Sequence, residues 1–191
     1  MSASDPVDPL SLGLALGRAF ERSRVPYALG GALAYGVWAV PRGTVDVDIN
    51  AFVQEPELPR VFEALDSLGI EYDPASATRA SRDAGLFVVR HSGFRIDIFT
   101  PSIPFSWEAL RTRVSVTIDG EAFWFLSAEA LSVFKLLFFR GKDLVDLERL
   151  VAVQGDRLDR AYVRQQIADT MGEDDERTRA WDRIIGATPR S

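Results

Sequence analysis

The chain has 191 residues, 47% of them hydrophobic and 26% charged, and its net charge is −6; this fits one domain, with or without a helical extension, and gives no general attraction for nucleic acid. The absence of cysteine excludes disulfides and thiolate zinc sites, and a single histidine argues against a nitrogen-rich metal site, so a bound metal would be held mainly by oxygen. The N-terminus lacks the basic start and apolar stretch of a secretory signal, and no run approaches the ~20 apolar residues of a membrane span, so we expect a cytoplasmic protein without membrane contact.

The first third of the sequence predicts alternating helices and strands. Apolar residues recur at helical or strand spacing, and proline or glycine separates the segments. The predicted elements are a helix at 9–24, a short strand at 27–31 that enters a tight turn, a helix at 32–40 and a strand at 44–53. In the last strand Asp46, Asp48 and Asn50 face one side, while Val45, Val47 and Ile49 face the other.

The remaining sequence predicts one further helix, two hairpins and then helices to the end. These elements are a helix at 56–68, a hairpin at 86–99 that turns at Ser92-Gly93, and a hairpin at 114–126 that turns at Asp119-Gly120. Ser127 is expected to cap the first of the final helices. We therefore predict an α+β fold, with a mixed sheet flanked by helices in residues 1–126 and a helical region in residues 127–191.

Three aspartates on predicted strands are the main chemical signal. Asp46 and Asp48 leave the same face of one strand, and Asp97 stands between two isoleucines on another. Aspartate packs poorly in strands, and like charges on one face repel unless a cation lies between them, which favours magnesium. The alternative for the Asp-x-Asp pair alone is a solvated polar face on an edge strand.

Gly30-Gly31 lies between a predicted strand and a predicted helix. Paired glycines let the backbone approach a ligand closely, and the helix N-terminus behind them offers N–H groups to phosphate oxygens. The alternative is a tight turn without a ligand. The pair followed by Asp46-x-Asp48 favours a phosphate site more strongly than either motif alone.

The stretch YALGGALAYGVWAVPRGTVDVDINAFV resembles the signature of the DNA polymerase beta-like nucleotidyltransferase superfamily: an apolar strand, two small residues, a helix, then Asp-hydrophobic-Asp on a strand. Within it the chain is most similar to abortive-infection type toxin nucleotidyltransferases, which carry an Arg-x-Ser/Thr-x-Asp-x-Asp pattern, here Arg42 to Asp48. They also carry a lysine on one helix and a basic-Asp-x-x-Asp start to the next, here LSVFKLLFFRGKDLVDLERL. The resemblance spans roughly residues 25–155.

The resemblance implies a role for each matching residue. Gly30 and Gly31 would hold the triphosphate of an NTP, and Asp46, Asp48 and Asp97 would bind two Mg²⁺ or Mn²⁺ ions, with Asp97 also placed to activate the attacking hydroxyl. Lys135 would reach the phosphates. Asp143 or Asp146 would orient Lys135, and Arg42 and Thr44 would position the phosphates or their loop.

Several residues also have a structural interpretation. The stem of Lys135 must lie near the core, so its ammonium either reaches solvent or pairs with an anion. Asp143 and Asp146 could supply that anion, or could simply be acids favoured at a helix N-terminus. His91 is expected at the surface of a hairpin turn. Five aromatic residues are expected to pack in the core: Tyr35, Trp38, Phe123, Trp124 and Phe125.

The sequence thus predicts a metal-dependent transfer of a nucleoside monophosphate from an NTP, ATP among the candidates, to an acceptor hydroxyl. The resemblance suggests tRNA or protein as acceptor, with a small molecule as the alternative, and the negative net charge argues mildly against a large RNA footprint. A second hypothesis is a module of the same fold that binds nucleotide or a partner protein without turnover. A third is a toxin held in check by an antitoxin protein.

Overall fold

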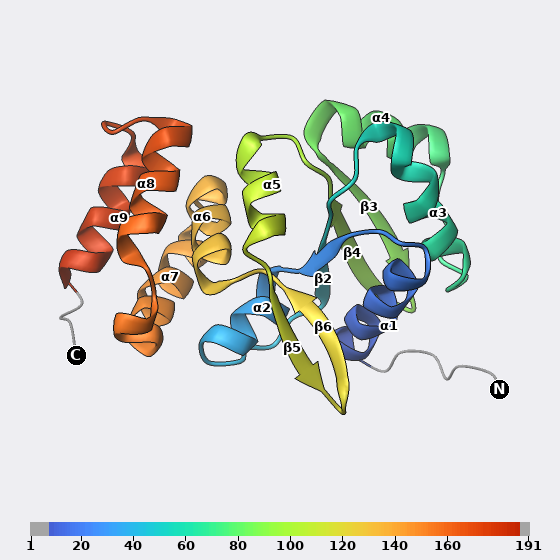
Figure 1. The fold of residues 1–191 in the computed structure, drawn as a ribbon, viewed down its shortest axis with the longest axis horizontal. Helices are drawn as coiled ribbons and strands as arrows, with labels where there is room; N and C mark the ends of the chain where they lie inside the picture. Colours follow the sequence, from blue (N-terminus) through green and yellow to red (C-terminus); the bar gives the residue numbers. More distant parts are fainter. Residues whose placement is uncertain (1–7, 188–191) are drawn as a thin grey trace.

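A six-stranded mixed sheet forms the centre of the protein, seen in a computed structural model that describes residues 8–187 (Figure 1). The strand order is β3-β4-β2-β1-β6-β5. Pairs β3–β4, β5–β6 and β1–β2 are antiparallel, whereas β2–β4 and β1–β6 are parallel. The strands are β1 (Tyr27–Leu29), β2 (Asp46–Ala51), β3 (Leu86–His91), β4 (Phe94–Phe99), β5 (Val114–Ile118) and β6 (Glu121–Phe125).

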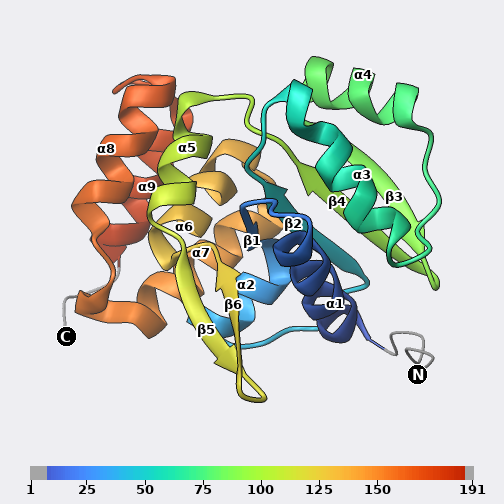
Figure 2. The same cartoon turned by 45° about the vertical axis from the view of Figure 1, so that its right-hand side comes forward.

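Helices cover the sheet, and a group of helices continues the fold beyond one end of it (Figures 1 and 2). Helix α1 packs on β1, β2 and α3, α4 packs on β3, and α2 packs on β2, α6 and α7. Helices α6 to α9 pack against one another beyond the sheet. The helices are α1 (Pro9–Arg22), α2 (Gly31–Trp38), α3 (Leu58–Asp66), α4 (Pro74–Ala84), α5 (Pro104–Arg111), α6 (Ala128–Phe138), α7 (Gly141–Gln154), α8 (Arg160–Met171) and α9 (Glu176–Ala187), with short 3₁₀ turns at Glu55–Glu57 and Gly155–Arg157.

The alternation of strand β2 separates a core face from a polar face. Val47 and Ile49 are fully buried, as are Ile96 and Ile98 on the neighbouring β4. The aspartates between them point to the opposite side, where they are only partly buried. Burying each of these aliphatic side chains contributes about 2 kcal/mol, so the core fixes which face the acids occupy.

The end of the chain is helical, as expected, and its packing is continuous with the sheet. Ser127 caps α6, its Oγ accepting a hydrogen bond of 3.1 Å from the backbone N–H of Ala130. The buried Trp181 of α9 donates from Nε1 to the carbonyl of Arg160 at 3.1 Å. One apolar cluster runs from α1 to α9. The division into residues 1–126 and 127–191 stays a prediction, and residues 1–7 and 188–191 lie outside the described part.

The α+β fold and both hairpins are confirmed. Positive φ angles at Ser92 and Gly93, and at Asp119 and Gly120, mark the two expected turns. The sequence prediction missed α4 and α5, both of which begin with proline. Helix α4 buries only Ala77, and its sequence PASATRASRDA has no large apolar residue to mark a core face. The prediction for Val45 was wrong: it precedes β2 and is 70% exposed.

No helix within residues 8–187 is both long enough and apolar enough to cross a bilayer.

Candidate active site

A cavity of about 510 Å³ lies between the polar face of the sheet and the helices α6 and α7. Its walls come from four places in the chain: the start of α2, the loop before β2, the strands β2 and β4, and the segment joining α6 to α7. The predicted site residues that line it are Gly31, Arg42, Thr44, Asp46, Asp48, Asp97, Lys135 and Asp143. The fold therefore brings most of the predicted residues to one cavity, although they span more than a hundred positions.

The acids are aligned by strand pairing. Strands β2 and β4 run parallel, with Asp48 opposite Asp97 and Asp46 opposite Arg95. Neighbouring strands lie about 4.8 Å apart, so Asp48 and Asp97 leave the same face of the sheet side by side. Like charges at this spacing repel each other unless something neutralises them.

The pKa of Asp48 reflects this crowding. Burial, and after it the negative charges of Asp97 and Asp46, together raise this pKa from the ordinary value of 3.8 to about 6. The positive charges of Arg140 and Lys142 act in the opposite direction but do not compensate. A cation bound beside Asp48 would therefore stabilise its ionised form.

Arg95 supplies part of the missing positive charge. Its Nε donates to Oδ1 of Asp97 at 2.6 Å, and its charge also acts on Asp46 and Asp48. Within residues 8–187, no group of three or more acidic or histidine side chains is arranged to hold a metal ion. The three aspartates are thus neighbours on the sheet, but in this conformation one of them is engaged by an arginine.

The Gly30-Gly31 turn packs directly against Asp48. The N–H of Gly30 donates to the Asp48 carbonyl at 2.9 Å, and Gly31, with a φ of +50°, begins α2. A Cβ at Gly31 would lie 1.8 Å from Oδ2 of Asp48. Position 31 therefore requires glycine for both its backbone conformation and its space, and the N-terminal N–H groups of α2 lie beside the acids.

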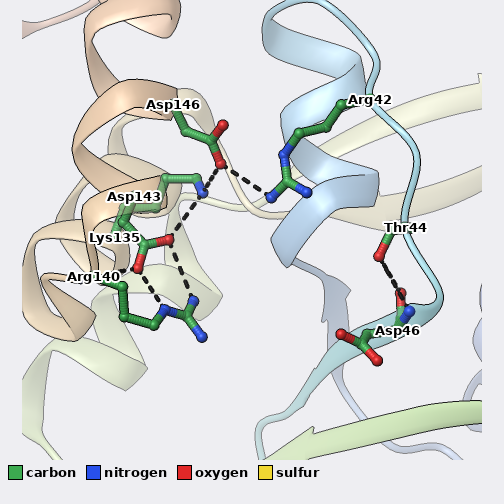
Figure 3. A network of polar contacts seen from close by, with 7 residues as sticks. All are labelled: Arg42, Thr44, Asp46, Lys135, Arg140, Asp143 and Asp146. Atoms are coloured by element: carbon green, nitrogen blue, oxygen red, sulfur yellow. Dashed lines mark hydrogen bonds and ion pairs between the residues drawn. The ribbon is translucent and has the colours of Figure 1, made fainter.

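Lys135 forms a buried ion-pair network with the two acids at the start of α7 (Figure 3). Its Nζ lies 2.7 Å from Oδ2 of Asp146 and 3.3 Å from Oδ1 of Asp143, and all three residues are at most 4% exposed. Arg42 reaches Asp146 at 3.1 Å from the loop after α2, and Arg140 reaches Asp143 at 2.6 Å. The predicted pairing of Lys135 with these acids is therefore present.

Burial raises the pKa of Asp143, but the hydrogen bond from Arg140 and the positive charges of Lys135 and Arg140 outweigh it, so the pKa lies below its ordinary value. The cations around Asp143 thus favour its ionised form, and the network sets three cationic side chains against two acids. It ties α6, α7 and the loop before β2 together, which fixes one wall of the cavity.

Thr44 orders the beginning of β2, because both hydrogen bonds of its hydroxyl are to the backbone of Asp46. Its Oγ1 accepts from the N–H of Asp46 at 3.1 Å and donates to the Asp46 carbonyl at 3.2 Å. In Figure 3 Asp46 lies apart from the Lys135 network, on the opposite wall of the cavity. Thr44 and Arg42 thus together hold the loop that leads from α2 to β2 in place.

The sequence reasoning missed Arg140 as a site residue and left Lys142 without a role. Both line the cavity, and both charges act on Asp48. The signal was present in the sequence, because Arg140-Gly141-Lys142 directly precedes the acids of α7. Asn50, on the same face as Asp46 and Asp48, also lines the cavity.

The other candidates lie outside the cavity. His91 pairs with Phe94 across the hairpin turn, as expected. Tyr35 is fully buried, and Trp38 donates from Nε1 to the Leu126 carbonyl at 2.7 Å. The aromatic residues of β6 at positions 123 and 125 belong to the core.

Comparison with solved structures identifies the fold. The chain matches a solution structure of the antibiotic-resistance factor ANT(2'')-Ia with a TM-score of 0.59 and 13% identity, over 84% of this chain and 90% of that one. It matches a crystal structure of ANT(2'')-Ia in complex with adenylyl-2''-tobramycin with a TM-score of 0.58 and 14% identity, over 84% and 95%.

The chain has the nucleotidyltransferase fold. An antigenic nucleotidyltransferase-like protein from Paracoccidioides brasiliensis shares it, with a TM-score of 0.50 and 13% identity over 100% of this chain and 97% of that one. No protein-family model and no curated protein matches the sequence. Within this nucleotidyltransferase fold, the acids of β2 and β4 and Gly31 at the start of α2 line the same cavity.

Proposed function

We propose that this protein is a nucleotidyltransferase that transfers a nucleoside monophosphate from an NTP to an acceptor hydroxyl and releases pyrophosphate. One observation carries the proposal: Asp48 and Asp97 are strand partners beside the Gly31 turn, in one cavity with the cations of residues 140 and 142. Acids alone would repel a triphosphate, and cations alone would not need buried acids. The combination suits a phosphate substrate that arrives with divalent cations.

The residues present fit magnesium or manganese by their chemistry. All the donors are carboxylate oxygens, the ligands that hard cations prefer, and the raised pKa of Asp48 reflects its burial together with the negative charges of its neighbours. Asp46, Asp48 and Asp97 would hold the cation once Asp97 turns away from Arg95. When bound, the cation would neutralise these carboxylates and polarise phosphate oxygens.

The protein's own groups would position the triphosphate. The Gly30-Gly31 backbone allows close approach, and the N–H groups at the start of α2 face phosphate oxygens. Arg140 and Lys142 add positive charge from the opposite wall. Lys135 uses two of its three ammonium protons on Asp143 and Asp146, which leaves the third for a phosphate oxygen.

Asp97 is the proposed acceptor of the hydroxyl proton. In this structure its Oδ1 accepts a hydrogen bond from Arg95, so this oxygen becomes available for the proton only when the ion pair opens. The new bond joins the acceptor oxygen to the α-phosphorus, and the bond from that phosphorus to the bridging oxygen breaks in line. Positioning and charge neutralisation supply most of the acceleration in such transfers.

Finer assignments rest on the family resemblance alone. They comprise ATP as a candidate NTP, tRNA or protein as acceptor, and a toxin role with an antitoxin partner; the cytoplasmic location is a separate prediction from the sequence. Each of these stays a prediction. A small-molecule acceptor is the alternative, taken up below.

A nucleotide-binding module without turnover is the second candidate. The observation that favours it is the ion pair of Asp97 with Arg95. In this pair the carboxylate contacts a cationic side chain instead of joining Asp46 and Asp48 as a metal ligand. Nucleotide binding alone would leave this pair closed.

The deciding experiment uses NTPs labelled at the α-phosphate, with Mg²⁺ and separate pools of cellular RNA, protein and small molecules. We expect label in one pool together with an equal amount of pyrophosphate, and neither in EDTA. Binding of NTP by calorimetry with no pyrophosphate in any pool would support the module instead.

A further inference from the structure

A second cavity, of about 250 Å³, adjoins the first at the ends of β2 and β4. It lies among the end of α4, the loop at 100–103, α5 and α6. Four residues line both cavities: Asn50, Phe99, Phe134 and Phe138. The two cavities are therefore adjacent and share a wall, and the proposed chemistry leaves the second one without a role.

The aromatic pair Phe99–Phe138 lies where the two cavities meet. Their ring centroids are 5.7 Å apart, and Phe138 is 47% exposed. The guanidinium of Arg140 lies 5.0 Å from the Phe138 ring centroid. The boundary between the two cavities is thus an apolar contact. The Arg140 guanidinium lies on its nucleotide side, and the apolar second cavity lies on the other.

Asp97 and Phe99 leave the same face of β4, two residues apart and hence about 7 Å along the strand. A molecule seated against Phe99 in the second cavity can therefore place a short hydroxyl arm beside Asp97. The proposed proton acceptor and the second cavity have the right separation for an acceptor substrate.

The lining of the second cavity is uncharged. Among the residues that the structure describes, its walls carry phenylalanine, leucine, isoleucine, alanine and proline, with neutral hydroxyl and amide groups between them. Two of its polar groups already have partners: Oγ1 of Thr100 lies 2.8 Å from Oγ of Ser81, and Nδ2 of Asn50 donates to the Ala28 carbonyl at 3.4 Å. An ion brought here would lose hydration without meeting an opposite charge in the walls.

We propose that the second cavity is the acceptor subsite and that the acceptor is a small, uncharged, mainly apolar molecule with a hydroxyl group. This inference rests on the proposed function. A polycation would need acids in the walls, and a nucleic acid would need cations for its phosphates, and neither is present among the described lining residues. The volume also suits one or two rings rather than a polymer.

The transfer balances without a further reactant. The acceptor oxygen forms a bond to the α-phosphorus, and pyrophosphate leaves with the electrons of the broken P–O bond. The hydroxyl proton passes to Asp97. The product is a phosphodiester between the nucleoside and an apolar alcohol.

The first test measures binding with three probes of one shape: 2-phenylethanol, 2-phenylethylamine and phenylacetate. Amide chemical shifts of the full chain are followed by NMR in titrations without nucleotide. We expect 2-phenylethanol to shift the amides of residues 99–106, and the two charged probes to bind about tenfold or more weakly. Equal binding of all three, or no shift with 2-phenylethanol, would overturn the subsite.

A matched pair of variants locates the binding. Ala84, exposed at the end of α4, lines the second cavity, whereas Ala152, exposed on α7, lines neither cavity. We expect Ala84→Trp to weaken 2-phenylethanol binding about tenfold and Ala152→Trp to leave it unchanged. Because both positions are exposed, neither change threatens the core. Equal effects of the two variants would contradict the location.

Activity separates this inference from the proposed function. If label from the NTP appears on 2-phenylethanol and Ala84→Trp abolishes it, both proposals stand. If 2-phenylethanol binds but no acceptor releases pyrophosphate, the proposed function fails and the apolar site remains. If label goes to RNA or protein while 2-phenylethanol neither binds nor reacts, the transferase stands and the apolar subsite is wrong.

Discussion

Asp48 and Asp97 face each other across the parallel strands β2 and β4, one pair in a register that also sets Asp46 opposite Arg95. The register of β2 against β4 brings the negative charges close together. A shift of β2 by one residue would bury the acids and expose Val47 and Ile49, so the apolar core selects this register. The apolar core therefore holds the acids together even without a cation. Four expectations follow from this relationship and from the groups around it.

Replacing Asp48 by asparagine should stabilise the metal-free protein. Because burial and the neighbouring acids raise the pKa of Asp48 to about 6, its ionisation at pH 7 costs on the order of 2 to 3 kcal/mol. An acid with a raised folded-state pKa contributes its full stability below 3.8 and loses it as the pH rises toward 6. Thermal unfolding in EDTA should show a higher Tm for Asp48→Asn at pH 7, and no difference near pH 3.

Added Mg²⁺ should reverse the order at pH 7, raising the Tm of the native protein but not that of Asp48→Asn. The exposed Asp174→Asn is the control, and it should behave like the native protein. A lower Tm for Asp48→Asn in EDTA at pH 7 would show that the carboxylate is not electrostatically strained.

Gly31→Ala should disrupt the phosphate site. The new Cβ would overlap Oδ2 of Asp48, and alanine at a φ of +50° costs about 1 to 2 kcal/mol in addition. Nucleotide affinity should fall by about tenfold or more, measured by calorimetry with Mg²⁺ and ATP. Gly36→Ala in the same helix meets only ordinary contacts at 3.8 Å and should bind nucleotide normally. Equal affinities would mean that the turn does not contact the triphosphate.

Lys135→Met should destabilise the fold strongly. It leaves the carboxylates of Asp143 and Asp146 buried, each with one remaining arginine, and removing one member of a buried ion pair costs about 3 to 5 kcal/mol. Arg111→Met, which breaks an exposed pair with Glu108, should cost less than about 1 kcal/mol. Urea unfolding compares the two. A similar small cost at both positions would show that Lys135 reaches solvent when its partners are removed.

Arg95→Gln should release Asp97 for cation binding. Without the 2.6 Å contact the three acids lose their nearest positive charge, so the Tm in EDTA should fall and the increase on adding Mn²⁺ should be larger than in the native protein. Arg79→Gln, on the exposed face of α4, serves as the control. An unchanged response to Mn²⁺ would mean that Arg95 does not compete with the cation.

Much of the fold could be predicted because its signals are local. The alternation around Asp46 and Asp48 and the turns at Ser92-Gly93 and Asp119-Gly120 each follow from a few adjacent residues. Helix α4 was missed because it contains no large apolar residue to mark a core face, and α5 because it has only 8 residues, about two turns in which a period can show.

The site was predictable only in part. The family resemblance pointed to the three aspartates and to Lys135, but the ion pair of Arg95 with Asp97 depends on side-chain rotamers, which sequence spacing does not fix. The cavity beside Phe99 depends on packing between α5 and α6, where the ring centroids of Phe105 and Phe134 lie 5.3 Å apart. Such contacts arise only when the whole chain has folded.

The most direct measurement is the rate of pyrophosphate release, with Mg²⁺ and a labelled NTP, for the native protein and for Asp48→Asn/Asp97→Asn. Circular dichroism verifies that the double variant is folded, and Asp174→Asn serves as the matched control. The account predicts that the double variant loses release by about a thousandfold or more while the control retains it. Pyrophosphate release by the folded double variant at the native rate would contradict it.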